Sequence, residues 1–287
     1  MTREIPIPAN KILQKLLDGI IQLNPGLISG MYVTGSIPLN DFHPNKSDID
    51  FIILWNELPT PDIQSQLEQL HKRIDRKFKI KLNGCYITHG SLNVHHSPTS
   101  KSLCYQERQM NESAFEMAPV TLYELKTTAI TIMGIPAQEL PVAVDISDVN
   151  KFLFENINGY WKNWIDKHSS FSIHRLLLIL FPRLSEWVIL GVARQLYTLK
   201  TGKITSKTGA GYYCLEQLPD KYHSIIRKAI KIRNDNSDHL LTVRSSYYIQ
   251  HSIKRAHETI ACANYIIQLF SEEYKQTVKA NTTFEKA

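Results

Sequence analysis

Short apolar runs of the kind that form strands are concentrated in the first half of the chain. The runs Met31–Val33, Asp50–Trp55 and Cys85–Thr88 are bounded by turn-forming residues, as strands usually are. Beyond Pro141 the apolar residues recur instead at steps of three and four, which is the period of an amphipathic helix. This change of period predicts an α+β protein, with an α/β domain over residues 1–140 and an all-helical domain over residues 141–287.

The same periodicities place individual elements. In the first domain, helices are expected over residues 10–23 and 63–78. Residues 89–112 are rich in Ser, His and Asn and have no period, so they are expected to form a loop. In the second domain, helices are expected over residues 150–165, 176–200, 207–216, 221–233 and 246–270. The polar tail after about residue 272 is expected to be disordered.

The composition is typical of a globular protein and excludes several other classes. Of the 287 residues, 43% are hydrophobic. The longest apolar run, Leu176–Phe181, is far shorter than the ~20 residues of a membrane span, and no apolar signal segment follows the N-terminus. The four cysteines are scattered, which fits reduced thiols rather than disulfides or a zinc site. We therefore expect a cytoplasmic protein without a membrane partner.

The net charge of +6 is distributed unevenly along the chain. Residues 1–150 carry 13 Lys and Arg against 16 Asp and Glu, whereas residues 151–287 carry 20 against 11. The basic half could bind an anion, but a surface that only aids solubility explains the counts equally well. No nucleic-acid partner is expected, because the basic run Arg227–Arg233 lacks interleaved aromatic residues and matches no recognised module.

A glycine–serine pair precedes two closely spaced aspartates. Gly35-Ser36 follows the first apolar run, and Asp48-Ile49-Asp50 opens the second. Aspartates at i and i+2 of one strand point to the same face, where two carboxylates repel each other unless a cation lies beside them. Mg²⁺ binds such oxygen ligands together with substrate phosphates, and Gly35 permits close approach to the backbone. The pattern favours metal-assisted nucleotidyl transfer, although both motifs also occur by chance and Asp48 could simply end a turn.

These residues belong to longer segments that resemble known families. Residues 32–36, YVTGS, and 46–51, KSDIDF, resemble the active-site signature of the polymerase-beta-like nucleotidyltransferases. Residues 187–210, WVILGVARQLYTLKTGKITSKTGA, resemble the helical domain of the aminoglycoside 3″/9 adenylyltransferases and of uncharacterised bacterial proteins that share it. Residues 215–233 extend this similarity, and NINGYWKNW around Trp161 is similar to the segment that opens the domain. The resemblance covers about residues 5–270.

The resemblance implies ATP as co-substrate and Mg²⁺ as cofactor. It assigns Gly35, Ser36, Ser47, Lys203 and Lys207 to the nucleotide and Asp48 and Asp50 to the metal. Lys207 stands at a predicted helix start, from which it would neutralise the charge that develops on the leaving pyrophosphate. Lys203 has the same candidate role, but it is equally well explained as a solvated loop lysine.

One position departs from the family pattern. In the family a third carboxylate, on the next strand, completes the metal site and acts as general base, and the matching position here is Asn83. An amide does not accept a proton at neutral pH, and general-base catalysis typically contributes ~10²–10⁴-fold. Another group could replace it, the visible candidates being His89, His95, Glu107 and Glu112. Alternatively, transfer proceeds without a strong base, or the protein is a degenerate nucleotide-binding protein.

The acceptor site is expected in the helical domain. The related enzymes hold polycationic aminoglycosides with acidic and aromatic side chains, and Glu186, Trp187 and Trp161 lie in the corresponding part of this chain. Glu186 could pair with an ammonium or guanidinium group, and Trp187 could stack on a sugar. A tryptophan at helical spacing among apolar residues is more often part of the core, and the family's acidic residues are replaced here by Leu184 and Ser185.

Together these patterns predict ATP-dependent O-adenylylation of an aminoglycoside-type antibiotic of the streptomycin/spectinomycin class, or of a related hydroxylated small molecule. The enzyme is expected to act as a monomer or weak dimer. The alternatives are a catalytically weak or degenerate transferase that binds a nucleotide or ligand, and a transferase that modifies a macromolecule.

Overall fold

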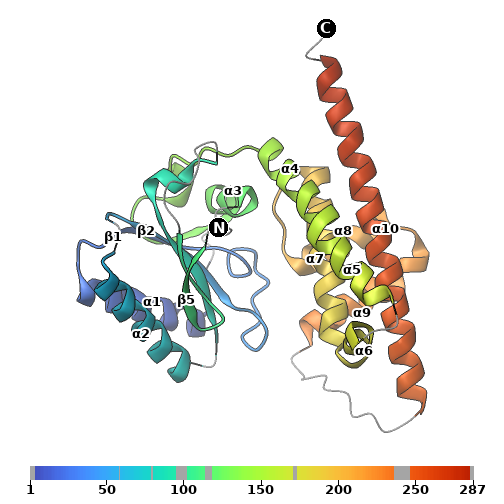
Figure 1. Ribbon diagram of the computed structural model, residues 1–287, viewed down its shortest axis with the longest axis horizontal. Coiled ribbons are helices and arrows are strands. Elements are labelled where there is room, and N and C mark those ends of the chain that lie inside the picture. The colour runs from blue at the N-terminus through green and yellow to red at the C-terminus, as the bar shows by residue number, and fades with distance from the viewer. Residues whose placement is uncertain are drawn as a thin grey trace. The chain divides into compact units, whose positions relative to one another are not determined.

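The computed structural model describes residues 4–57, 59–78, 80–94, 102–113, 118–170, 173–235 and 246–284. The chain divides into two compact units, Met1–Val149 and Asn150–Ala287 (Figure 1). The first unit combines helices with a mixed sheet, and the described part of the second is helical. The predicted α+β fold class is therefore confirmed.

The described part of the first unit contains a six-stranded sheet with the spatial order β5-β4-β3-β2-β1-β6. Its strands are β1 (Ile28–Val33), β2 (Ile49–Trp55), β3 (Leu82–Thr88), β4 (Ser102–Gln106), β5 (Gln109–Ser113) and β6 (Ile130–Met133). β2 and β3 are parallel, and the other neighbouring pairs are antiparallel. Because β2 and β3 run in the same direction, their first residues lie side by side, and Asp50 pairs with Asn83.

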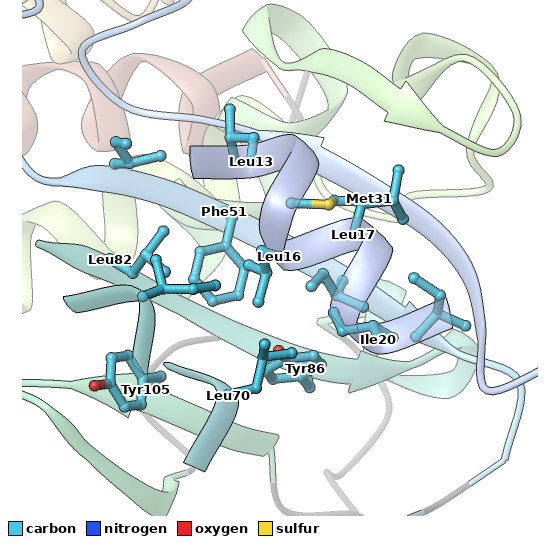
Figure 2. Packing of buried hydrophobic residues seen from close by; sticks show 14 of the residues in the cluster. Leu13, Leu16, Leu17, Ile20, Met31, Phe51, Leu70, Leu82, Tyr86 and Tyr105 are labelled. Atoms are coloured by element: carbon cyan, nitrogen blue, oxygen red, sulfur yellow. The ribbon is translucent and has the colours of Figure 1, made fainter. Parts of the chain in front are cut away.

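Two helices cover one face of this sheet. α1 (Ile7–Leu23) and α2 (Pro61–Lys77) turn their apolar faces toward a core that includes Phe51 and Met31 (Figure 2). Both helices carry proline in the first turn, where the missing N–H leaves no hydrogen bond unmade. Since α1 and α2 occupy the face that carries Phe51, the polar residues that alternate with it along β2 and β3 belong to the other face.

The expectation of a loop over residues 89–112 was wrong in its second half. β4 and β5 form a hairpin there, with Glu107 and Arg108 in the turn at φ +47° and +66°. Glycine or asparagine usually occupies such positive-φ positions, so the usual hairpin signal is absent from the sequence. The strands form because β4 pairs with β3 and buries Leu103 and Tyr105 in the core.

The described residues of the second unit form a series of helices. They are α4 (Ile146–Asn156, which begins in the first unit), the π-helical turn η4 (Ile157–Trp161), α5 (Lys162–Ser169), α6 (Ile173–Leu180), α7 (Pro182–Thr201), α8 (Lys207–Gln217), the 3-10 turn η5 (Asp220–Tyr222), α9 (His223–Asn234) and α10 (Ser246–Phe284). Each predicted helix of this half is found in the described residues, although three of them differ in extent; the one predicted over residues 150–165 extends from Ile146 to Ser169 through α4, η4 and α5.

The helix predicted over residues 176–200 is broken into two, and the last helix extends further than expected. Pro182 lacks an N–H and disfavours helical backbone at Phe181, so α6 ends at Leu180 and α7 begins at an angle of 96° to it. The disorder expected after about residue 272 was wrong, because α10 continues to Phe284. Tyr274 stacks on Phe154 with ring centroids 4.4 Å apart, which ties this part of α10 to α4.

Within the described residues, no single helix has both the length and the apolar composition needed to cross a membrane. The bent pair α6 and α7 meets that criterion when the two helices are taken together.

Candidate functional site

The aspartate pair lies at the beginning of β2. Asp50 is the second residue of the strand and is half-buried, whereas Asp48 precedes the strand and is exposed. Phe51 points into the core beneath α1 and α2, so Asp50 points to the opposite face of the sheet. Because the strand begins only at Ile49, strand alternation by itself does not place Asp48 on the face of Asp50, and its assignment there stays a prediction.

Gly35 and Ser36 form the turn that leaves β1 and meets Asp50. The amide of Thr34 donates to the carbonyl of Asp50 at 3.1 Å, which extends the pairing of β1 and β2 as far as this turn. Gly35 has a φ of +70°, and a Cβ at this position would overlap the carboxylate of Asp50. Glycine is the residue that accepts both the left-handed backbone and the close contact. The structure therefore brings the glycine–serine pair and Asp50 together.

The hydroxyl group of Ser36 is buried and has no hydrogen-bond partner among the residues that the structure describes. Most buried polar atoms are paired, so an unpaired Oγ in this turn fits a group that hydrogen-bonds to a ligand. The Ser47 hydroxyl, in contrast, accepts a hydrogen bond from the amide of His43 at 3.1 Å. Ser47 therefore helps to fold the loop between the glycine–serine pair and the aspartates.

Asn83 lies beside Asp50 on the neighbouring strand. Its Nδ2 donates to Oδ1 of Asp50 at 3.1 Å. Where a second carboxylate would repel Asp50, the amide stabilises its charge. The chain thus has a hydrogen-bond donor at this position of β3.

Two of the replacement bases considered from the sequence, His89 and Glu112, lie away from the carboxylate of Asp50. His89 follows β3 at the opposite end from Asn83, about 20 Å along an extended strand, and its Nε2 lies 2.9 Å from the Ser29 hydroxyl. Glu112 pairs with Leu103, so it belongs to the helix-covered face rather than to the face of Asp50. Glu107 is exposed in the turn after β4, and the end of β4 lies beside the beginning of β3, so the structure leaves Glu107 as a candidate. His95 lies outside the described residues.

A carboxylate that the sequence analysis missed does reach this turn. Glu124 lies on α3 (Pro119–Thr128), and its Oε1 accepts a hydrogen bond from the amide of Gly35 at 3.0 Å. Its neighbours Leu122 and Leu125 are buried, whereas Glu124 is half-buried. The sequence carries no motif here that could have identified it, since a single glutamate between two inward leucines is an ordinary helix pattern.

Among the described residues, no group of three or more His, Cys, Asp or Glu side chains lies close enough together to hold a metal ion. The carboxylates of Asp48 and Asp50 are oxygen donors of the type that Mg²⁺ takes from a protein when phosphate oxygens and water supply the other ligands. These two carboxylates, together with the Ser36 hydroxyl in the Gly35–Ser36 turn, fit a complex of a nucleotide with a metal ion.

In the second unit, Lys207 is the first residue of α8, as expected. Ser206 caps this helix by accepting from the amide of Gly209 at 3.0 Å, and the helix N-terminus carries partial positive charge that favours anions. Lys203 follows Gly202, whose φ of +66° ends α7, and its side chain is exposed.

Two of the three predicted acceptor residues, Trp161 and Trp187, lie in an aromatic cluster. Trp161, at the end of η4, is buried, and its ring centroid is 4.6 Å from that of half-buried Trp187 on α7. Trp164 contacts Trp187 edge-on at 5.6 Å and stacks on His168 at 3.5 Å. Burial lowers the pKa of His168, which favours its neutral form. Glu186 is buried, and its Oε1 has no hydrogen-bond partner in the described part of the chain. Trp161 is thus a core residue, whereas Trp187 is only partly enclosed.

The packing of this cluster is testable at Gly191 on α7. A Cβ there would approach Cη2 of Trp161 to 2.5 Å, so we expect Gly191→Ala to lower the free energy of unfolding by about 1–3 kcal/mol. The matched control is Gly159→Ala in η4, where a Cβ would meet nothing within 4 Å. Denaturant unfolding of the two variants measures the difference. Equal stability of both variants would contradict the packing described here.

Comparison with known proteins places these observations in a family context. Residues 13–87 match the nucleotidyltransferase domain family, and residues 182–256 match the C-terminal domain of aminoglycoside adenylyltransferases. A spectinomycin 9-adenylyltransferase from Campylobacter jejuni is 22% identical over 79% of this chain and 84% of its own length. The crystal structure of a spectinomycin adenyltransferase from Enterococcus faecialis with ATP and spectinomycin has the same fold, with a TM-score of 0.61 and 20% identity over 86% of this chain and 99% of that chain.

Proposed function

The chain is a polymerase-beta-like nucleotidyltransferase that resembles the aminoglycoside adenylyltransferases, and we propose that it transfers AMP from ATP to a hydroxyl group of an aminoglycoside-type antibiotic. The proposed acceptors are of the streptomycin/spectinomycin class or are related hydroxylated small molecules. A cytoplasmic location and a monomeric or weakly dimeric state are part of this proposal.

One observation carries the proposal. The two family matches occur in one chain, in the order catalytic domain and then adenylyltransferase C-terminal domain. The spectinomycin-modifying relatives align with most of the chain rather than with one domain. A nucleotidyltransferase domain alone does not identify the acceptor. The match of the second domain to aminoglycoside adenylyltransferases supports an antibiotic as the acceptor.

The first unit is proposed to bind the nucleotide. The hydroxyl of Ser36 would donate to a phosphate oxygen, and Gly35 would contribute to the nucleotide site by allowing the left-handed turn and the close approach of Asp50. Asp48 and Asp50 would hold Mg²⁺, which when bound neutralises phosphate charge and polarises the reacting phosphoryl group. Ser47 would contribute by keeping the intervening loop folded, since its hydroxyl already accepts from His43.

The second unit is proposed to supply cations and the acceptor site. Lys207, at the positive N-terminus of α8, would bind the phosphates and stabilise the charge of the departing pyrophosphate. Lys203 is the alternative cation. In the acceptor site, Glu186 would pair with a cationic group of the antibiotic. Trp187 would stack on a sugar ring with the exposed part of its indole, while buried Trp161 packs against it.

The proposed reaction is a single in-line displacement. The oxygen of the acceptor hydroxyl forms a bond to the α-phosphorus, and the bond from that phosphorus to the bridging oxygen of pyrophosphate breaks. The hydroxyl proton leaves to solvent or to a base, and the products are the O-adenylyl antibiotic and pyrophosphate. Most of the rate enhancement in such transfers comes from positioning and charge stabilisation.

We propose that Asn83 occupies the position of the family's general-base carboxylate, which limits turnover. Replacing it by aspartate places a carboxylate next to Asp50, where Asn83 now donates a hydrogen bond. We expect Asn83→Asp to raise kcat for AMP transfer at saturating Mg²⁺ by about tenfold or more, at the low end of general-base effects. Steady-state kinetics at several pH values measure this. An unchanged kcat would mean that no base is needed here or that another group supplies it.

Asn83 also motivates a second candidate function, a nucleotide- or ligand-binding protein with little turnover. Two measurements separate the candidates: calorimetry with Mg²⁺ and ATP, and release of pyrophosphate in the presence of a panel of aminoglycosides. Binding together with acceptor-dependent pyrophosphate release supports the enzyme. Binding without release from any acceptor supports the binding protein, and absence of nucleotide binding contradicts both. Release that instead depends on an added protein or nucleic acid would indicate transfer to a macromolecule.

A further inference from the structure

We propose that Glu124 is a positioning residue that holds the Gly35–Ser36 turn in the shape that binds the nucleotide. This inference rests on the proposed function of that turn. Its starting point is the hydrogen bond of 3.0 Å from the amide of Gly35 to Oε1 of Glu124. α3 thereby contacts a turn that lies 89 residues earlier in the chain.

Two acidic side chains hold Gly35 from different sides. Glu124 accepts the hydrogen bond from its amide, and the carboxylate of Asp50 lies where a Cβ would otherwise be. A glycine at φ +70° can move to many other conformations at little cost. Hydrogen bonds from a backbone N–H to a charged carboxylate are roughly twice as strong as neutral ones, so the contact with Glu124 opposes that movement.

The hydrogen bond to Glu124 also determines which group of the turn can bind a phosphate. Because the Gly35 amide donates to Glu124, the phosphate-binding role falls on Ser36, whose hydroxyl is unpaired. The direction of that hydroxyl depends on the backbone of Gly35, the residue before it. Glu124 therefore acts on the nucleotide through Gly35 rather than by direct contact.

The contact requires an acceptor atom rather than a negative charge. Glutamine keeps an Oε1 of the same reach, whereas alanine removes the acceptor. We therefore expect Glu124→Ala to raise the Kd of Mg²⁺–ATP by about tenfold, the effect of losing one hydrogen bond to a charged group, and Glu124→Gln to stay within about threefold of the native value. The KM for ATP should follow the same order, and the KM for the antibiotic should not change.

The test combines calorimetry with Mg²⁺–ATP and hydrogen exchange at the Gly35 amide in the nucleotide-free protein. Gly35 exchange should accelerate in Glu124→Ala and be slow again in Glu124→Gln. Glu139→Ala, at an exposed glutamate of the same unit, is the matched control and should leave both readouts unchanged. A general-base role for Glu124 would instead lower kcat in Glu124→Gln without changing the Kd of ATP.

Several results would overturn the inference. Equal ATP affinity in Glu124→Ala and the native chain would do so, as would a Glu124→Gln variant that stays folded but binds ATP as poorly as the alanine variant. If the native chain binds no Mg²⁺–ATP, the proposed function fails and the positioning role falls with it. Gly35 exchange still separates the two failures, because loss of protection in Glu124→Ala shows that the contact exists but serves another purpose.

Discussion

Replacing Asp50 by asparagine is expected to reduce the rate of AMP transfer by about 10³-fold or more, since charge stabilisation by a bound metal ion contributes several kcal/mol to such reactions. The substitution removes one negative charge and one of the oxygens proposed to bind the metal while keeping the shape of the side chain. The remaining amide oxygen can still accept from Nδ2 of Asn83, as Oδ1 of Asp50 does. We therefore expect the fold to persist while Mg²⁺-dependent ATP binding and transfer are lost.

The control for this prediction is Asp18→Asn, at an exposed aspartate on α1 in the same unit. Both variants should unfold at nearly the native temperature, and only Asp50→Asn should lose transfer in a steady-state assay. Transfer by Asp50→Asn within a few-fold of the native rate would contradict the assignment of Asp50 to the metal.

Replacing Gly35 by alanine is expected to reduce transfer by about 10²-fold or more, the effect of displacing reacting groups by about 1 Å. Alanine at φ +70° costs roughly 1–2 kcal/mol. Its Cβ also overlaps the Asp50 carboxylate, so the turn and Asp50 must move apart. The substitution should therefore lower both the thermal stability of the first unit and its affinity for ATP.

Gly90→Ala separates this specific effect from a general cost of replacing glycine. The nearest atom to a Cβ at Gly90 is Oγ1 of Thr88 at 3.8 Å, an ordinary contact distance. Calorimetry with Mg²⁺–ATP on both variants should show loss of binding for Gly35→Ala alone. Native ATP affinity in Gly35→Ala would show that the turn is not part of the nucleotide site.

The site could be predicted from the sequence where it depends on neighbours along the chain. The apolar runs predicted β1 and β2, and the residues at their ends, Gly35 and Asp50, meet because these strands pair. Asn83, in contrast, was identified through the family resemblance, because the predicted strand began only at Cys85; in the structure β3 begins at Leu82, and Asn83 pairs with Asp50. The positions of Gly35 and Asp50 at the ends of two paired strands are therefore enough to bring them together.

The position of Glu124 could not be predicted from the sequence. Its contact with Gly35 depends on how α3 packs against the turn, which no periodicity within Pro119–Thr128 encodes. The β4–β5 hairpin was missed for a related reason, since its turn uses Glu107 and Arg108 at positive φ in place of the residues that usually mark it. Both features arise from tertiary contacts rather than from local preference.

The helical half was predicted well in its elements and less well in their ends. Pro182 was a visible signal for a break, yet the continuous apolar periodicity on both sides suggested one helix. α10 continues past residue 272, where Tyr274 stacks on Phe154, a partner distant in sequence that a polar segment does not reveal locally.

The central claim is most directly tested on the antibiotic itself. Spectinomycin and streptomycin are incubated separately with the native chain, Mg²⁺ and ATP labelled at the α-phosphate, and the mass and label of the recovered antibiotic are measured. We predict that at least one antibiotic gains one AMP group carrying the label, and that Asp50→Asn abolishes this product. Recovery of both antibiotics unmodified, together with every member of a wider aminoglycoside panel, would contradict the proposed function.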